Sequence, residues 1–113
     1  MKKAFIAVLL TALLTINIVV VKAFDLGPNL EAKATKKIPP TYPPLAKRKR
    51  VEGKVVIRLE IGPEGNVSNA EFMEGNSLFK PSSLDAAKQW TFSKSMAGTS
   101  GHIIFKFQLE EKD

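Results

Sequence analysis

Residues 42–53, YPPLAKRKRVEG, run directly into KVVIRLEI, residues 54–61, and this passage decides the fold. Over residues 53–61 apolar and polar side chains alternate with one exception, Val56, which is the pattern of a strand with one buried face. Before the strand, residues 44–50 predict a short helix, because a proline is well tolerated in a first helical turn. The passage therefore predicts a helix that is followed at once by a strand.

A tight turn follows this strand and reverses the chain. GPEGNV, residues 62–67, has the glycine, proline and asparagine that turns favour. We therefore expect a hairpin and a second strand over residues 67–74. In that second strand Ala70 and Phe72 share one face, and Val67 is expected on the other.

A second helix and a last strand complete the pattern. Residues 78–90 predict a helix of about three turns. Its inward face is marked by small and aromatic side chains: Phe79, Ser83, Ala86, Ala87 and Trp90. Residues 102–109 alternate again and predict a final strand with Ile103, Phe105, Phe107 and Leu109 on one face. The order helix, strand, strand, helix, strand predicts a small α+β two-layer sandwich, in which two helices cover one face of a three-stranded antiparallel sheet.

Residues 1–23 have the features of an export signal. Two lysines precede an apolar run at residues 4–21, and Val-Lys-Ala at residues 21–23 resembles a signal-peptidase site. We interpret the segment as a cleaved signal peptide. The alternative is a retained inner-membrane anchor, because about 18 apolar residues reach the lower limit for a membrane span. Either way, the rest of the chain is expected outside the cytoplasm.

The rest of the chain is expected to form a linker and one domain. Residues 24–37 show no hydrophobic period and are interpreted as a linker. The domain is expected over residues 38–113 and opens with the proline-rich IPPTYPP. Without residues 1–23 the chain carries 14 basic and 11 acidic residues, a net charge of +3. This mild excess does not indicate nucleic acid as a partner.

Few residues suggest catalysis or metal binding. The chain has no cysteine and only one histidine, His102, so it offers no disulfide, no Cys/His metal cluster and no Cys–His nucleophile. Its serines lie in no nucleophile motif. We therefore expect no enzyme and no cofactor. The basic run KRKR at residues 47–50 is interpreted as a solvated helix face; the alternative is a contact surface for an acidic partner segment.

The final strand is the candidate binding element. At the edge of a sheet one row of backbone N–H and C=O groups is unpaired, and such an edge can dimerise or accept an extended peptide as an added strand. The candidate partner-binding residues are therefore His102, Ile103, Ile104, Phe105, Lys106, Phe107 and Gln108. Structural roles in turns and in the core are assigned to Tyr42, Pro43, Gly53, Gly65, Trp90 and Phe92.

Four motifs in this order resemble the TonB C-terminal domain family. They are Tyr42-Pro43 with its downstream alanine and Val-Glu-Gly, then GPEGNV, then Trp-Thr-Phe at residues 90–92, and finally HIIFKFQL at residues 102–109. The resemblance covers about Pro40 to Leu109 and implies the fold predicted above. It also implies a periplasmic domain whose last strand binds the TonB box, an extended segment of outer-membrane receptors that take up siderophore-bound iron or cobalamin.

The resemblance further implies an inner-membrane helix that couples to an ExbB–ExbD motor, and a long proline-rich spacer. This chain departs from that design: its leader has no histidine, and Lys94 stands where the family commonly has proline. The spacer at residues 22–41 reaches only about 65–70 Å when stretched and averages about 25 Å as a coil. We therefore expect a periplasmic TonB-like protein-binding module, either an energy transducer or an accessory adapter. The alternative is a structural envelope module that self-associates as a homodimer, without a link to energised transport.

Overall fold

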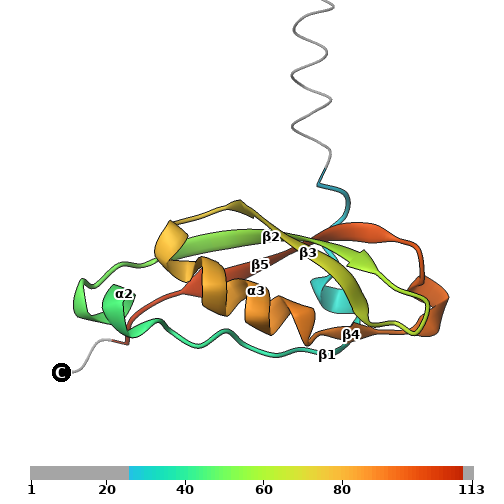
Figure 1. Cartoon of the computed structure of the whole chain (residues 1–113), viewed down its shortest axis with the longest axis horizontal. Coiled ribbons are helices and arrows are strands. Elements are labelled where there is room, and N and C mark those ends of the chain that lie inside the picture. Colours follow the sequence, from blue (N-terminus) through green and yellow to red (C-terminus); the bar gives the residue numbers. More distant parts are fainter. Residues whose placement is uncertain (1–25, 111–113) are drawn as a thin grey trace, which may run out of the picture.

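The computed structural model of the chain describes residues 26–110, which form an α+β sandwich (Figure 1). Its main sheet is antiparallel, with three strands in the order β3 (Val67–Glu74), β2 (Gly53–Ile61) and β5 (Ser100–Phe107). Helix α3 (Lys80–Lys88) lies across one face of this sheet (Figure 1). The predicted fold class is confirmed.

The core lies between the sheet and α3. Alternation in β2 and β5 points one row of side chains from each strand toward the helix. None of these side chains is more than 6% exposed: Val55, Ile57, Leu59, Ile61, Ile103, Phe105 and Phe107. The side chains predicted for the inward helix face, from Phe79 to Trp90, are all buried. Phe79 stacks on Phe107 with ring centroids 3.9 Å apart, which ties the helix layer to the last strand.

The second helix is shorter than predicted. A 3₁₀ turn, η2 (Ser77–Phe79), comes before α3, and the Asn76 side chain caps it by accepting a hydrogen bond from the Leu78 N–H at 2.9 Å. Pro81 lies in the first turn of α3, where an N–H has no intrahelical partner to lose. The helix ends at Lys88, before Trp90.

Helix α2 (Pro44–Arg48) lies at one end of the sandwich (Figure 1). It is shorter than the predicted residues 44–50, because Arg50 has a φ of +54° and leaves the right-handed helix. Ala46 is fully buried, whereas Leu45 is 40% exposed. In a helix little longer than one turn, only one position faces the core.

The last strand is offset from its prediction. It runs from Ser100 to Phe107 rather than over residues 102–109. It stops there because the Leu109 N–H donates to the Glu52 carboxylate at 2.7 Å instead of continuing the ladder with β2. Upstream of β5, the chain forms a further 3₁₀ turn, η3 (Lys94–Met96).

One side chain of β3 is reoriented by a bulge. Ile61 pairs with Val67, whereas the preceding Glu60 pairs with Asn69, so Ser68 is an extra residue in the strand. The bulge returns Val67 to the inner face, where it packs against the core. The expectation that Val67 lies on the outer face was therefore wrong.

Residues 26–37 are part of the folded domain, which corrects their interpretation as a linker. A 3₁₀ turn, η1 (Glu31–Lys33), leads into β1 (Ala34–Lys36), which pairs with β4 (Thr91–Phe92) in a second, two-stranded sheet. Leu30 is only 3% exposed and belongs to the core. Most of these attachments use backbone groups, so they leave no hydrophobic period in the sequence.

The predicted export segment, residues 1–23, lies outside the described residues. Within residues 26–110, none of the helices has the length and hydrophobicity that a membrane span requires. The same residues contain no group of three or more His, Cys, Asp or Glu side chains arranged to hold a metal ion.

Candidate functional site at the outer edge of β5

The outer edge of β5 carries backbone groups that point away from the sheet. In an antiparallel pair, residues alternate between those that bond to the partner strand and those whose N–H and C=O point outward. His102 belongs to the outward set, because its N–H donates to Pro28 O at 2.9 Å and its C=O accepts from the Leu30 N–H at 2.8 Å. Ile104 and Lys106 are in phase with His102 and also point outward. Among the described residues, no backbone group pairs with theirs on this side.

The structure separates the predicted partner-binding residues by depth. Ile103, Phe105 and Phe107 are core residues, and their backbone groups belong to the ladder with β2. Ile104 and Lys106 are the accessible residues, half-buried and exposed respectively. A partner at this edge would therefore meet the backbone of Ile104 and Lys106 and the side chains beside them.

The two ends of the predicted segment behave differently from its middle. At one end, the outward groups of His102 are occupied, and its ring Nδ1 lies 3.0 Å from Gly27 O. At the other end, Gln108 is exposed and lies beyond the last residue of β5. The free part of the edge is therefore shorter than the predicted site.

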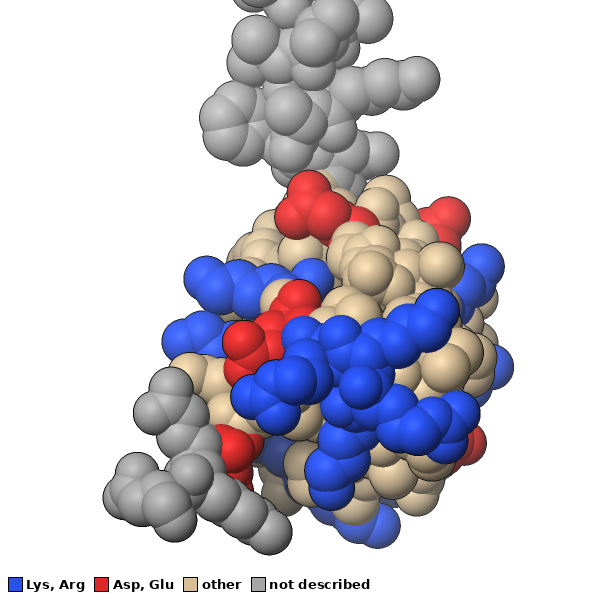
Figure 2. Space-filling model, turned by 90° about the vertical axis from the view of Figure 1, so that its left-hand side faces the viewer, with Lys and Arg blue, Asp and Glu red and all other residues tan. Residues whose placement is uncertain are grey.

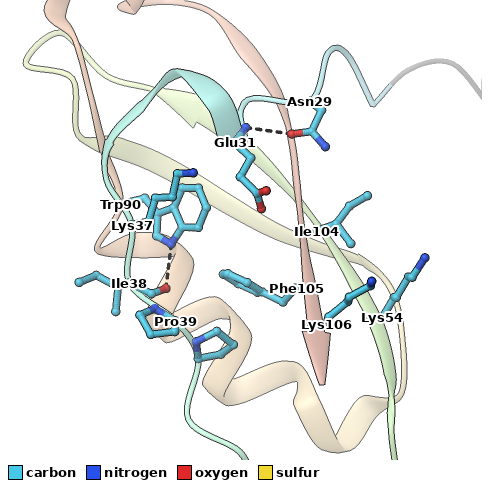
Figure 3. A pocket seen from close by; sticks show the side chains of 11 residues that line it. Asn29, Glu31, Lys37, Ile38, Pro39, Lys54, Trp90, Ile104, Phe105 and Lys106 are labelled. Atoms are coloured by element: carbon cyan, nitrogen blue, oxygen red, sulfur yellow. Dashed lines mark hydrogen bonds between the residues drawn. The ribbon is translucent and has the colours of Figure 1, made fainter. Parts of the chain in front are cut away.

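A groove of about 620 Å³ runs along this free edge (Figure 3). One wall is β5 at residues 104–106, and the other is the extended chain at residues 37–40. Trp90 holds the second wall in place, because its indole Nε1–H donates to Ile38 O at 2.9 Å. The Trp90 ring also packs edge-on against Phe105, with centroids 5.8 Å apart. The groove therefore combines a polar strand edge with aromatic residues from the core.

The charges along the groove are mostly positive. Lys37, Lys54 and Lys106 line it, and Glu31 is the one carboxylate among its described lining residues. Figure 3 shows Lys54 next to Lys106, with Glu31 farther along the groove. This arrangement favours a ligand with negative charge near the two neighbouring lysines.

A second basic surface covers the end of the domain that carries α2 (Figure 2). All four residues of the KRKR run, residues 47–50, are exposed there. Within the described part of the chain, no carboxylate lies within 4.0 Å of their charged groups. Both interpretations of the run, a solvated helix face and a contact for an acidic segment, fit this geometry and stay predictions.

The tyrosine assigned a structural role joins three parts of the domain. The Tyr42 hydroxyl donates to Val51 O, and its ring packs edge-on against Phe79 and Phe107 at 5.8 and 5.5 Å. Burial and then the nearby charge of Glu52 raise the pKa of the Tyr42 phenol above its ordinary value. Tyr42 is therefore held as a neutral hydrogen-bond donor.

The other residues assigned structural roles lie at turns and at the ends of elements. Gly65 has a φ of +85°, and its carbonyl accepts a hydrogen bond from the Phe92 N–H at 2.7 Å. Pro43 precedes α2 in an extended conformation, and Gly53 opens β2 opposite Phe107. The β2–β3 turn is thus fastened to β4, the short strand that follows α3.

Two contributors to the site were missed by the sequence analysis. Leu30 anchors the segment that covers His102, and Ile38 supplies the carbonyl that fixes the opposite wall. The available signals were a lone apolar residue after Gly27-Pro28-Asn29, residue types that favour a turn, and the prolines of IPPTYPP, which favour an extended chain.

Comparison with known proteins gives the family. A family model described as Gram-negative bacterial TonB protein C-terminal matches residues 38–111. Protein TonB of Xanthomonas campestris pv. campestris (strain B100) is 33% identical over 73 residues, which are 63% of this chain and 33% of that protein. Protein TonB of Klebsiella pneumoniae is 25% identical over 79 residues, which are 68% of this chain and 32% of that protein. The chain thus spans about a third of the length of these relatives.

A solved structure shows the same fold. The solution NMR structure of the Pseudomonas aeruginosa TonB CTD matches with a TM-score of 0.59 at 23% identity, covering 72% of this chain and 89% of that one. Because the family model spans well over half of the sequence, the chain belongs to the family of Gram-negative bacterial TonB C-terminal domains.

Proposed function

We propose that this chain is a periplasmic, non-enzymatic binding module that captures an extended segment of an outer-membrane receptor in TonB-dependent transport. The observation that carries the proposal is the free edge of β5, where Ile104 and Lys106 present outward backbone groups to a groove. Membership of the TonB C-terminal family supports the same role. Siderophore uptake is the transport process that we expect it to serve.

Capture would work by adding a strand to the sheet. A segment laid in the groove can exchange hydrogen bonds with Ile104 and Lys106, as in other proteins that recognise peptides by β-augmentation. These backbone bonds supply affinity for any extended chain. Lys54 and Lys106 would favour segments with an acidic residue at the matching position.

The position of residues 26–37 favours an accessory adapter over a force-transmitting arm. Because these residues pack on the domain, the chain left between the apolar run and the domain is residues 22–25. Fully stretched, it reaches only about 14 Å. With the leader retained, coupling to an ExbB–ExbD-like motor would therefore hold the domain beside the inner membrane. With the leader cleaved, the domain is free in the periplasm.

The mass of the protein recovered from the cell envelope decides between these two forms. We expect a species that starts at Phe24, the result of cleavage after Ala23. A species that retains Met1 or Lys2 would support the anchored form and would favour the energy-transducing role over the adapter role.

Binding itself is tested with synthetic peptides from the N-terminal segments of outer-membrane receptors of the same cell. Titration calorimetry on the full chain gives the affinity. Ile104→Pro and Lys106→Pro each remove an outward N–H that β2 does not use, so the sheet should survive. We expect each to weaken binding about tenfold or more, since a hydrogen bond is lost and the proline ring obstructs the edge.

The matched control is Ile104→Val, which keeps the N–H and should bind like the unmodified chain. Phe105→Pro is a poor test, because its N–H belongs to the ladder with β2. If folded Ile104→Pro and Lys106→Pro bind with unchanged affinity, capture by strand addition at this edge is wrong. Concentration-dependent dimerisation without peptide affinity would support the self-associating envelope module instead.

A further inference from the structure

The chain's own residues 27–30, which we call the N-terminal strip, use part of the candidate binding edge. Asn29 forms a parallel bridge with His102. The Leu30 N–H and the Pro28 C=O take both outward backbone groups of His102, at 2.8 and 2.9 Å. The strip therefore occupies the position that an added strand would need next to Ile104.

The strip fits closely against β5. A Cβ on Gly101 would lie 2.4 Å from Pro28 O and 2.7 Å from Leu30 Cγ, so only a glycine leaves room for the strip there. Gly27, with a φ of +71°, is also close to β5: a Cβ on it would be 3.0 Å from Gly101 Cα. Leu30 is buried in the core, and the His102 ring reaches Gly27 O. The strip is thus held by backbone bonds, a side-chain anchor and a glycine contact.

We propose that the N-terminal strip is an end-stop that limits the length and sets the register of the segment captured by β5. With the strip in place, a ligand can pair with the outward groups of Ile104 and Lys106 and then meets the strip, whose Leu30 N–H already occupies the His102 carbonyl. A ligand that continues toward His102 must displace the strip and break its two hydrogen bonds. Gly101 and Leu30 are then specificity-determining residues, and a short extended segment is the preferred ligand. This inference rests on the proposed function.

The test compares three receptor-derived peptides on the full chain and its variants. One has about five residues centred on the groove, and two are extended by about three residues at the N-terminal or the C-terminal end. On the unmodified chain, neither extension should improve the affinity, because each bond gained at His102 replaces one lost from the strip. Titration calorimetry measures all three.

Releasing the strip should change this result for one peptide only. Gly101→Ala expels the strip, and Leu30→Ser removes its anchor without touching β5. In both variants, the peptide whose extension runs toward His102 should bind about 10- to 30-fold more tightly, the equivalent of two hydrogen bonds. The five-residue peptide should bind as before. Amide exchange at His102 should be faster without a ligand, since its N–H loses Pro28 O.

A reversible lock supplies the matched control. The chain has no cysteine, so Asn29→Cys with His102→Cys can form only one disulfide, between two bridge partners. In the oxidised form, the extended peptides should bind no better than the short one. The single variants Asn29→Cys and His102→Cys control for the loss of the native side chains.

The outcomes separate this inference from the function on which it rests. If the short peptide binds but both release variants show no gain for either extended peptide, the end-stop is wrong and the capture function stands. Tighter binding of an extended peptide than of the short one by the oxidised protein with Asn29→Cys and His102→Cys would also overturn the end-stop. If no peptide binds any of the proteins, the proposed function is wrong, and the end-stop falls with it.

Discussion

Replacing Ser83 with alanine should make this domain more stable. Ser83 lies on the inward face of α3 and is fully buried. Among the described residues its hydroxyl finds no hydrogen-bond partner. In the unfolded chain the same hydroxyl is hydrated, so folding removes its hydrogen bonds to water without providing one to the protein.

The magnitude follows from three terms. Leaving a buried hydroxyl unsatisfied costs about 1–3 kcal/mol, which the substitution recovers. Alanine is also a better helix former than serine by about 0.5 kcal/mol. Against these gains stands the small void left by one oxygen atom, about 1 kcal/mol at most. Ser83→Ala should therefore raise the free energy of unfolding by about 1–2 kcal/mol, or the melting temperature by about 5–10 °C.

Urea denaturation followed by the fluorescence of Trp90, the only tryptophan, measures the change. The adjacent Ser82→Ala is the matched control. The Ser82 hydroxyl donates to Phe79 O at 3.4 Å, so a weak bond is lost as helix propensity is gained, and the net change should stay within about 0.5 kcal/mol. A Ser83→Ala domain that is less stable than the unmodified chain would show that the hydroxyl is hydrogen-bonded, and would refute the reasoning.

Three further predictions concern the turn, the groove and the tyrosine. Gly65→Ala should destabilise the domain by about 3 kcal/mol in urea, because its Cβ would lie 2.0 Å from Phe92 O at a φ of +85°; an unchanged midpoint would contradict this contact. Trp90→Phe should lower the free energy of unfolding by about 1–3 kcal/mol, since the hydrogen bond to Ile38 O is lost. It should also speed proteolysis at residues 37–40, and equal cleavage rates would mean that other contacts hold this wall of the groove. The pKa of Tyr42 is raised in the folded state. The contribution of Tyr42 to the free energy of unfolding is therefore complete below about pH 10 and is lost as the pH rises further. Tyr42→Phe should flatten the alkaline part of a plot of stability against pH, and an identical slope in both proteins would contradict the assignment.

The elements that bury a regular row of side chains could be predicted from the sequence. Alternation located β2 and most of β5, and a helical period located the face of α3 that runs from Phe79 to Trp90. In each case burial requires apolar side chains at a fixed spacing, so the spacing of apolar residues in the sequence predicts the element. The edge of β5 followed from the position of that strand at the end of the sheet.

Features made by backbone pairing could not be predicted in this way. β1 and the segment before it attach mainly through N–H and C=O groups, which every residue carries. Among residues 26–36, Leu30 is the one buried side chain that could have marked them. The bulge at Ser68 depends on a one-residue slip that alternation cannot show. The end of β5 depends on a single carboxylate, that of Glu52. As a result the sequence located the candidate edge but not the segment that covers its beginning.

The pairing of the first described residues with the last strand also bears on the order of folding. Gly27 and His102 are 75 residues apart in the sequence, and the hydroxyls of Thr35 and Thr91, which hydrogen-bond, are 56 apart. Contacts between such distant residues require closure of a long loop and form late. During synthesis the N-terminal residues emerge first, yet they must wait for β5 before they can dock. A newly folding chain therefore passes through an interval in which the whole outer edge of its sheet is bare, and in that interval it is most exposed to aggregation.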